Sequence, residues 1–137
     1  MTQTHELHGR HTAADVAASC AAHEAQGGVS HAIAYRQLLQ LAADLRAVSD
    51  AGQVALAADE PDETAGRWKD AVAALIEHRF AARRIPLPAW VETCVGHPDD
   101  PWEPQRDATP LWFPVDLAEV AEPFLRRGVL IEASELD

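Results

Sequence analysis

The sequence predicts a mostly α-helical fold, a small helical domain with about three main helices and an irregular C-terminal third rich in proline and tryptophan. Apolar residues make up 47% of the 137 residues but aromatic residues only 6%. Alanine inflates the apolar share, so we expect a thin helical core. Eight of the nine prolines lie from Pro86 onward, which excludes a long helix there.

The first helix is predicted from its end signals. Residues 1–11 are polar and rich in histidine, and we expect a disordered N-terminus there. Thr12 can cap a helix that runs to about Gln26 and stops at the glycine pair 27–28. Residues 12–137 then form a single domain, with an irregular acidic segment from about residue 86.

The second helix is predicted from hydrophobic spacing. Ser30 can cap it, and it runs to about Ser49. Apolar residues recur every three to four positions, which is typical of one helix face. We interpret this stripe as a core face, and a homodimer seam is the alternative. The stripe contains Ala34, Leu38, Leu41, Leu45 and Val48.

The third helix follows an alanine-rich stretch, residues 52–60, that shows no clear period. Asp62 or Thr64 can begin it, with acidic residues at the start that the helix dipole favours. Trp68, Val72, Leu75, Ile76 and Phe80 form its predicted apolar face.

The stretch RFAARRIPLPAW, residues 79–90, ends this helix. Pro86 and Pro88 set an extended exit, so we interpret the stretch as a hinge from which Trp90 folds back over the helix. Further along, short helices are expected from Asp116 and over 124–127, followed by an extended segment at 129–131 and a trailing end at 134–137.

The charge is concentrated in the C-terminal part. The formal net charge is −11, and 11 of the 22 acidic residues lie from residue 86 onward beside only three arginines. Such a surface repels phosphate backbones and attracts basic proteins. We therefore expect a basic protein partner and no nucleic acid. The N-terminus has no apolar run, so we expect no signal peptide, no membrane association and a cytoplasmic protein.

Two groups of residues raise the alternative of a metal-dependent enzyme. His5 and His8 enclose Glu6 and Leu7, one residue short of the His-Glu-x-x-His spacing of zinc proteases. The second group provides a thiol, an imidazole and carboxylates but no closed four-ligand set. We predict no cofactor, no metal site and no catalytic residue. The other members of these groups are His11, Cys20 and His23 in the first, and Cys94, His97, Asp99 and Asp100 in the second.

Residues 12–46 raise the alternative of a DNA-binding regulator. The sequence GGVS and a following helix with Tyr35, Arg36 and Leu38 resemble the turn and recognition helix of bacterial helix-turn-helix regulators. The first helix is about two turns too long for that motif, so the match is degenerate. The residues available for DNA contact are His31, Arg36, Gln37, Gln40 and Arg46.

The C-terminal half carries a second resemblance. WKDAVAALIEHRFAARRIPLPAW, residues 68–90, and EPFLRRGVLIEASELD, residues 122–137, frame a loop rich in tryptophan and proline. This pattern over residues 68–137 resembles small, uncharacterised proteins of high-GC, actinobacterial-type bacteria. Some of these are antitoxin-like members of two-gene pairs. The resemblance implies a protein that binds another protein, and it transfers no catalytic residue.

Together these observations predict a non-catalytic protein-binding module, antitoxin-like in that it neutralises its partner. Exposed aromatic residues of the C-terminal third would anchor the partner, and acidic residues beside them would steer it. The predicted anchors are Trp102, Trp112, Phe113 and Phe124, and the predicted acidic residues are Asp99, Asp100 and Glu103.

Overall fold

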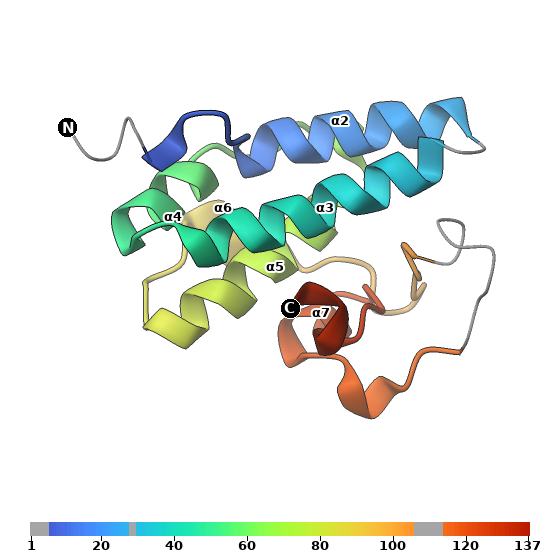
Figure 1. Cartoon of the computed structure of the whole chain (residues 1–137). Helices are drawn as coiled ribbons and strands as arrows, with labels where there is room; N and C mark the ends of the chain where they lie inside the picture. The colour runs from blue at the N-terminus through green and yellow to red at the C-terminus, as the bar shows by residue number, and fades with distance from the viewer. Residues whose placement is uncertain (1–5, 28–29, 106–113) are drawn as a thin grey trace.

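Three long helices form the framework of the protein. The computed structural model describes residues 6–27, 30–105 and 114–137. Helices α2 (Ala13–Gln26) and α3 (Ser30–Ala47) lie side by side, and α5 (Arg67–Arg83) packs against both (Figure 1). The described residues are mostly helical, which confirms the predicted fold class.

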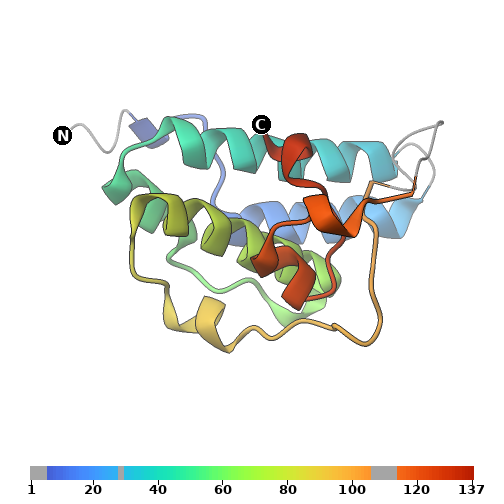
Figure 2. The same cartoon turned by 90° about the horizontal axis from the view of Figure 1, so that it is seen from below.

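Shorter elements complete the fold around this framework. The C-terminal ones pack against α5 and α3, as Figure 2 shows in orange and red. The described residues contain two isolated β-bridges, Trp102 with Val129 and Val120 with Glu132, and no strand. The short α-helices are α4 (Asp50–Ala57), α6 (Ala89–Thr93) and α7 (Glu122–Arg126), and the 3₁₀ turns are η1 (Glu63–Ala65), η2 (Leu117–Glu119) and η3 (Ala133–Leu136).

Local signals set both ends of α2, as predicted. The Thr12 side chain accepts a hydrogen bond from the Asp15 amide at 3.1 Å, and Gly27 ends the helix with φ 71°. A positive φ suits glycine because it has no Cβ. The apolar stripe of α3 is buried inside the monomer, with Leu38, Leu41 and Leu45 each at most 1% exposed. The stripe is therefore a core face, as predicted.

We did not predict helix α4, because the alanine-rich residues 52–60 do not show the hydrophobic spacing that is typical of a helix. Ser49 caps it and accepts from the Gly52 amide at 3.1 Å. The Ser49 hydroxyl also donates to the Glu6 carboxylate at 2.8 Å. Glu6 belongs to the segment 1–11 that we expected to be disordered, and residues 1–5 of that segment lie outside the described residues.

Helix α5 begins later than predicted and lies at the centre of the fold. Asp62 caps the turn η1, and Gly66 at φ 59° separates that turn from the helix, which starts at Arg67. Instead of a single apolar face, six consecutive residues, 71–76, are buried. This middle part of the helix is covered on several sides, because α2, α3, α4, α6 and α7 all pack on α5.

The segment after α5 is extended through its prolines to α6, as the hinge interpretation predicted. Trp90 is buried and its indole donates to the Ala57 carbonyl at 2.9 Å, so it also joins α6 to the end of α4. The C-terminus does not trail off as predicted, because Leu136 is buried and its carbonyl accepts from Arg79 at 2.7 Å. Among the described helices, none combines the length and the apolar character needed to cross a membrane.

We expect Ser49→Ala to destabilise the protein by about 1 kcal/mol, because it removes the cap of α4 and the bond to Glu6. Ser134→Ala is the matched control, since Ser134 is exposed and caps no helix. Urea unfolding followed by circular dichroism measures both. Equal midpoints for the two variants would show that the cap contributes nothing.

Candidate functional site

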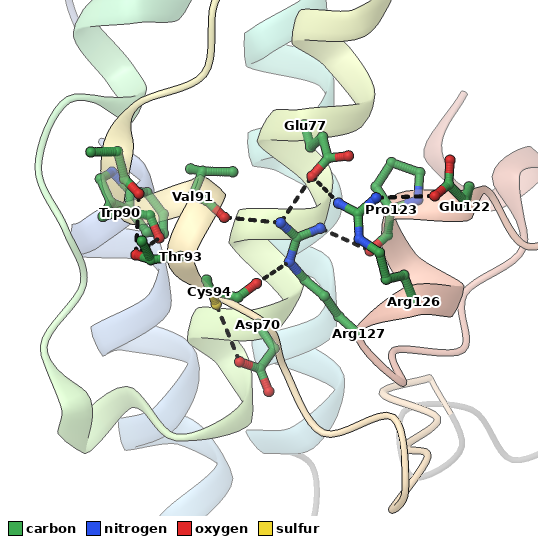
Figure 3. A network of polar contacts seen from close by, with 11 residues as sticks. Asp70, Glu77, Trp90, Val91, Thr93, Cys94, Glu122, Pro123, Arg126 and Arg127 are labelled. Carbon is green, nitrogen blue, oxygen red and sulfur yellow. Dashed lines mark hydrogen bonds and ion pairs between the residues drawn. The ribbon is translucent and has the colours of Figure 1, made fainter.

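The buried guanidinium group of Arg127 is a central attachment between the C-terminal third and the helices. Arg127 is 1% exposed, and Figure 3 shows its side chain between three elements. It donates to the Cys94 carbonyl at 2.8 Å through Nε and to the Pro123 carbonyl at 3.0 Å through Nη1. Its Nη2 donates to the Glu77 carboxylate at 2.9 Å and to the Val91 carbonyl at 3.0 Å. One side chain thus joins α5, α6 and α7.

Backbone contacts hold the loop that carries the predicted acidic residues. The His97 amide donates to the Arg127 carbonyl at 2.9 Å, and the Trp102 amide to the Gly128 carbonyl at 2.8 Å. Gly128 has φ 74°, and a Cβ there would lie 2.3 Å from the His97 carbonyl oxygen. The two chain segments can approach this closely only because residue 128 is glycine.

Trp102, a predicted anchor, is half-buried at this junction. Its ring meets the Trp68 ring edge to face, with centroids 4.8 Å apart. The Arg67 guanidinium carbon lies 5.5 Å from the Trp102 ring centroid, which is within cation–π range. Part of the ring therefore stabilises the fold, and the remainder is open to solvent.

Asp70 gathers the residues that raised the thiol and metal alternatives. It is buried, and His97 Nδ1 lies 2.7 Å from one carboxylate oxygen while the Cys94 thiol donates to the other at 3.5 Å. Burial raises the pKa of Cys94, and the Asp70 charge raises it further. The thiol is therefore held protonated, which opposes nucleophilic chemistry. Asp100 pairs instead with Arg67 at 3.7 Å.

The N-terminal group of candidate metal ligands consists of histidines and Cys20, and its members differ in burial. Cys20 is fully buried and donates to the Ala34 carbonyl at 3.2 Å, and burial raises its pKa to about 12. His8 and His11 are exposed, while His5 lies outside the described residues. Within the described ranges, no three side chains of the metal-binding types are arranged to hold an ion.

The exposed surface of the C-terminal third is acidic and contains apolar side chains. Asp99 and Asp100 are exposed on the first loop, and Glu103 is half-buried. Beyond residues 106–113, the turn η2 and helix α7 expose Glu119 and Glu122. Leu117 and Leu125 on the same two elements are 54% and 43% exposed. We call η2 and α7, with residues 99–103, the acidic surface.

The predicted aromatic anchors have different positions. Phe124 is completely buried and faces the His78 ring, so it belongs to the core. Trp112 and Phe113 lie outside the described residues. Sequence reasoning missed Leu117 and Leu125 as surface residues. Both lie in short elements without a hydrophobic period, so no sequence pattern marked them as exposed.

The residues of the DNA-binding alternative lie on α3. Arg36, Gln40 and Arg46 are exposed, and His31 and Gln37 are half-buried. Arg46 pairs with Asp137 at 3.6 Å. Helices α2 and α3 run side by side as a hairpin (Figures 1 and 2). In a helix-turn-helix motif the two helices instead cross at about 90–120°.

The comparisons with known proteins give no relative: no protein-family model, no curated protein and no solved structure matches this chain.

We expect Arg127→Met to lower the free energy of unfolding by about 3–5 kcal/mol, because Glu77 and three carbonyls lose their buried partner. Arg126→Met is the control: this neighbouring arginine also contacts Glu77 but is half-exposed, so its loss costs about 1 kcal/mol or less. Thermal and urea unfolding measure both. Equal losses would contradict the assignment of Arg127 as the main attachment.

Glu77 gives the stability a defined pH dependence. Burial alone would raise its pKa, but the hydrogen bonds and charges of Arg126 and Arg127 lower it below the ordinary value of 4.5. A carboxylate with a lowered pKa in the folded state stabilises the fold above its unfolded pKa, and this contribution disappears as the pH falls through the folded pKa.

We therefore expect the difference in stability between the wild type and Glu77→Gln to be constant above about pH 5.5 and to shrink below about pH 4.5. Urea unfolding over a pH series measures it. A difference that stays the same down to about pH 3 would show that Glu77 does not titrate in this way.

Proposed function

We propose that this protein is a non-catalytic binding module whose acidic surface takes up a basic protein partner. The observation that carries the proposal is the exposure of Leu117 and Leu125 among the carboxylates of η2 and α7. Exposed leucines beside charged residues provide an apolar centre with a charged rim, as in protein interfaces. Trp102 is half-buried and belongs to the part of this surface formed by residues 99–103.

The distribution of charge supports the same partner. Several arginines are used inside the fold: Arg127 holds the C-terminal third, Arg79 donates to the Ala42 and Leu136 carbonyls, and Arg83 donates to the Val48 carbonyl. The carboxylates Asp99 and Glu119 are exposed instead. Among the described residues, the exposed carboxylates outnumber the exposed arginines, which favours association with a basic surface.

The resemblance of residues 68–137 to antitoxin-like proteins of two-gene pairs adds a biological setting, in which this protein neutralises a toxin-like partner encoded beside it. We place this binding in the cytoplasm, because both cysteines are free thiols, as is usual in a reducing compartment. The alternative to this partner is a homodimer that uses the same two leucines as its interface. The helix hairpin and the protonated Cys94 make the DNA-binding and enzymatic alternatives weaker proposals.

The test is to co-express the untagged chain with the tagged product of each neighbouring gene and to purify at moderate salt. We expect a stoichiometric complex with one basic product. The double variant Leu117→Ser/Leu125→Ser should bind it about tenfold more weakly or worse, because apolar anchors carry much of the interface energy. Calorimetry or a biosensor measures the Kd.

Val54→Ser is the matched control, since Val54 is 46% exposed on α4 and lies outside the acidic surface. It should bind like the wild type. If the chain co-purifies with neither neighbouring gene product, the two-gene proposal fails. If a complex forms and the leucine variant retains full affinity, the acidic surface is not the interface.

A further inference from the structure

A cavity with a mixed apolar and polar lining lies between α2 and α3, and it shares no residue with the acidic surface. Its volume is about 200 Å³. The two helices that supply most of its walls run side by side in Figure 1. The lining residues are His11, Asp15, Val16, Ser19, Gln37, Gln40, Leu41 and Asp44.

The lining changes character with depth. Val16, Leu41 and Asp44 are buried and form the floor, and Asp44 is only 9% exposed. Ser19 and Gln37 are half-buried between the floor and the exposed residues of the rim, which are His11, Asp15 and Gln40. A ligand entering from the rim would therefore meet two aliphatic side chains and one carboxylate at the bottom.

Two acceptor atoms in this cavity are without donors. Gln40 Nε2 donates to Asp44 Oδ1 at 3.0 Å, and Arg10 Nε lies 3.4 Å from the same oxygen. Among the described residues, no donor reaches Asp44 Oδ2. The side-chain oxygen of Gln37 is buried and likewise has no donor within the described ranges. Buried acceptors are normally satisfied, so the Gln37 oxygen favours a ligand that donates hydrogen bonds, and Asp44 Oδ2 can accept from the same ligand.

The charges around the cavity favour a cation. Two carboxylates line the cavity, those of Asp15 and Asp44, and one guanidinium, that of Arg10, contacts Asp44. These three groups leave one net negative charge. A buried carboxylate that gains an ammonium donor forms a charge-assisted hydrogen bond, which is stronger than a neutral one.

We propose that this cavity binds a small organic cation, a primary alkylammonium with a short chain. The ammonium group donates to Asp44 Oδ2 and to the Gln37 side-chain oxygen, and the alkyl chain packs on Val16 and Leu41. The volume limits the size: it corresponds to about seven water molecules at roughly 30 Å³ each, below the ~300–1,000 Å³ of pockets for drug-sized ligands. The inference is independent of the proposed protein partner, because no residue of the acidic surface contributes.

The test is a titration of the isotope-labelled protein with n-butylammonium chloride, followed by amide chemical shifts. We expect saturable shifts centred on Gln37, Leu41 and Asp44. 1-Butanol, which has the same alkyl chain and no charge, should bind at least about tenfold more weakly. Shifts that stay linear through the titration, or equal responses to the two compounds, would overturn the proposal.

Variants separate the site from general charge attraction. Asp44→Asn keeps the shape of the floor and should weaken n-butylammonium binding about tenfold or more. Asp59→Asn is the control, because it removes the same charge from an exposed residue that does not line the cavity. Unchanged affinity in Asp44→Asn, or equal losses in both variants, would overturn the site.

A second variant covers the case in which Asp44→Asn does not fold, since Asp44 also contacts Arg10 and Gln40. Gln37→Leu removes the unpartnered amide without changing the charge, and it should weaken binding about fivefold. Full affinity in Gln37→Leu would overturn the assignment of the amide as a ligand-binding group.

Discussion

The arrangement of the C-terminal third depends on the buried guanidinium of Arg127. Its donors reach the carboxylate of Glu77 on α5 and backbone carbonyls at α6 and at the start of α7 (Figure 3). A buried charge is tolerated only when its donors are satisfied, and the packing of these elements gives an acceptor to Nε, Nη1 and Nη2 of Arg127. This one side chain supplies an attachment where proline and short helices leave few backbone contacts.

Two further arginines hold distant segments of the fold together in the same way. Arg79 and Arg83 bind carbonyls at the ends of helices and turns, which would otherwise lack donors. These positive charges therefore serve contacts within the fold, and the exposed carboxylates outnumber the exposed arginines among the described residues. Leu117 and Leu125 are exposed on the same elements as Glu119 and Glu122, which is the basis of the proposed protein partner.

The hairpin of α2 and α3 offers a different chemistry from the C-terminal third. Its outer groove contains buried Asp44 and an aliphatic floor, whereas the acidic surface is open and carries leucines. Exposed apolar side chains suit a macromolecule, and a buried carboxylate in a small pocket suits a small cation. The domain can therefore hold two binding sites with no residue in common.

The sequence by itself determined the mostly helical class, the ends of α2 and the irregular character of the proline-rich third. These features follow from Thr12, Gly27 and the prolines, whose effects act within a few residues of the backbone. Only the tertiary structure showed that α4 forms, with Ser49 as its N-cap and Glu6 bound to the Ser49 hydroxyl. It also decided that Phe124 is buried while Leu125 is exposed. Burial in such short elements depends on which distant segments meet, and the local pattern around Phe124 and Leu125 does not encode that.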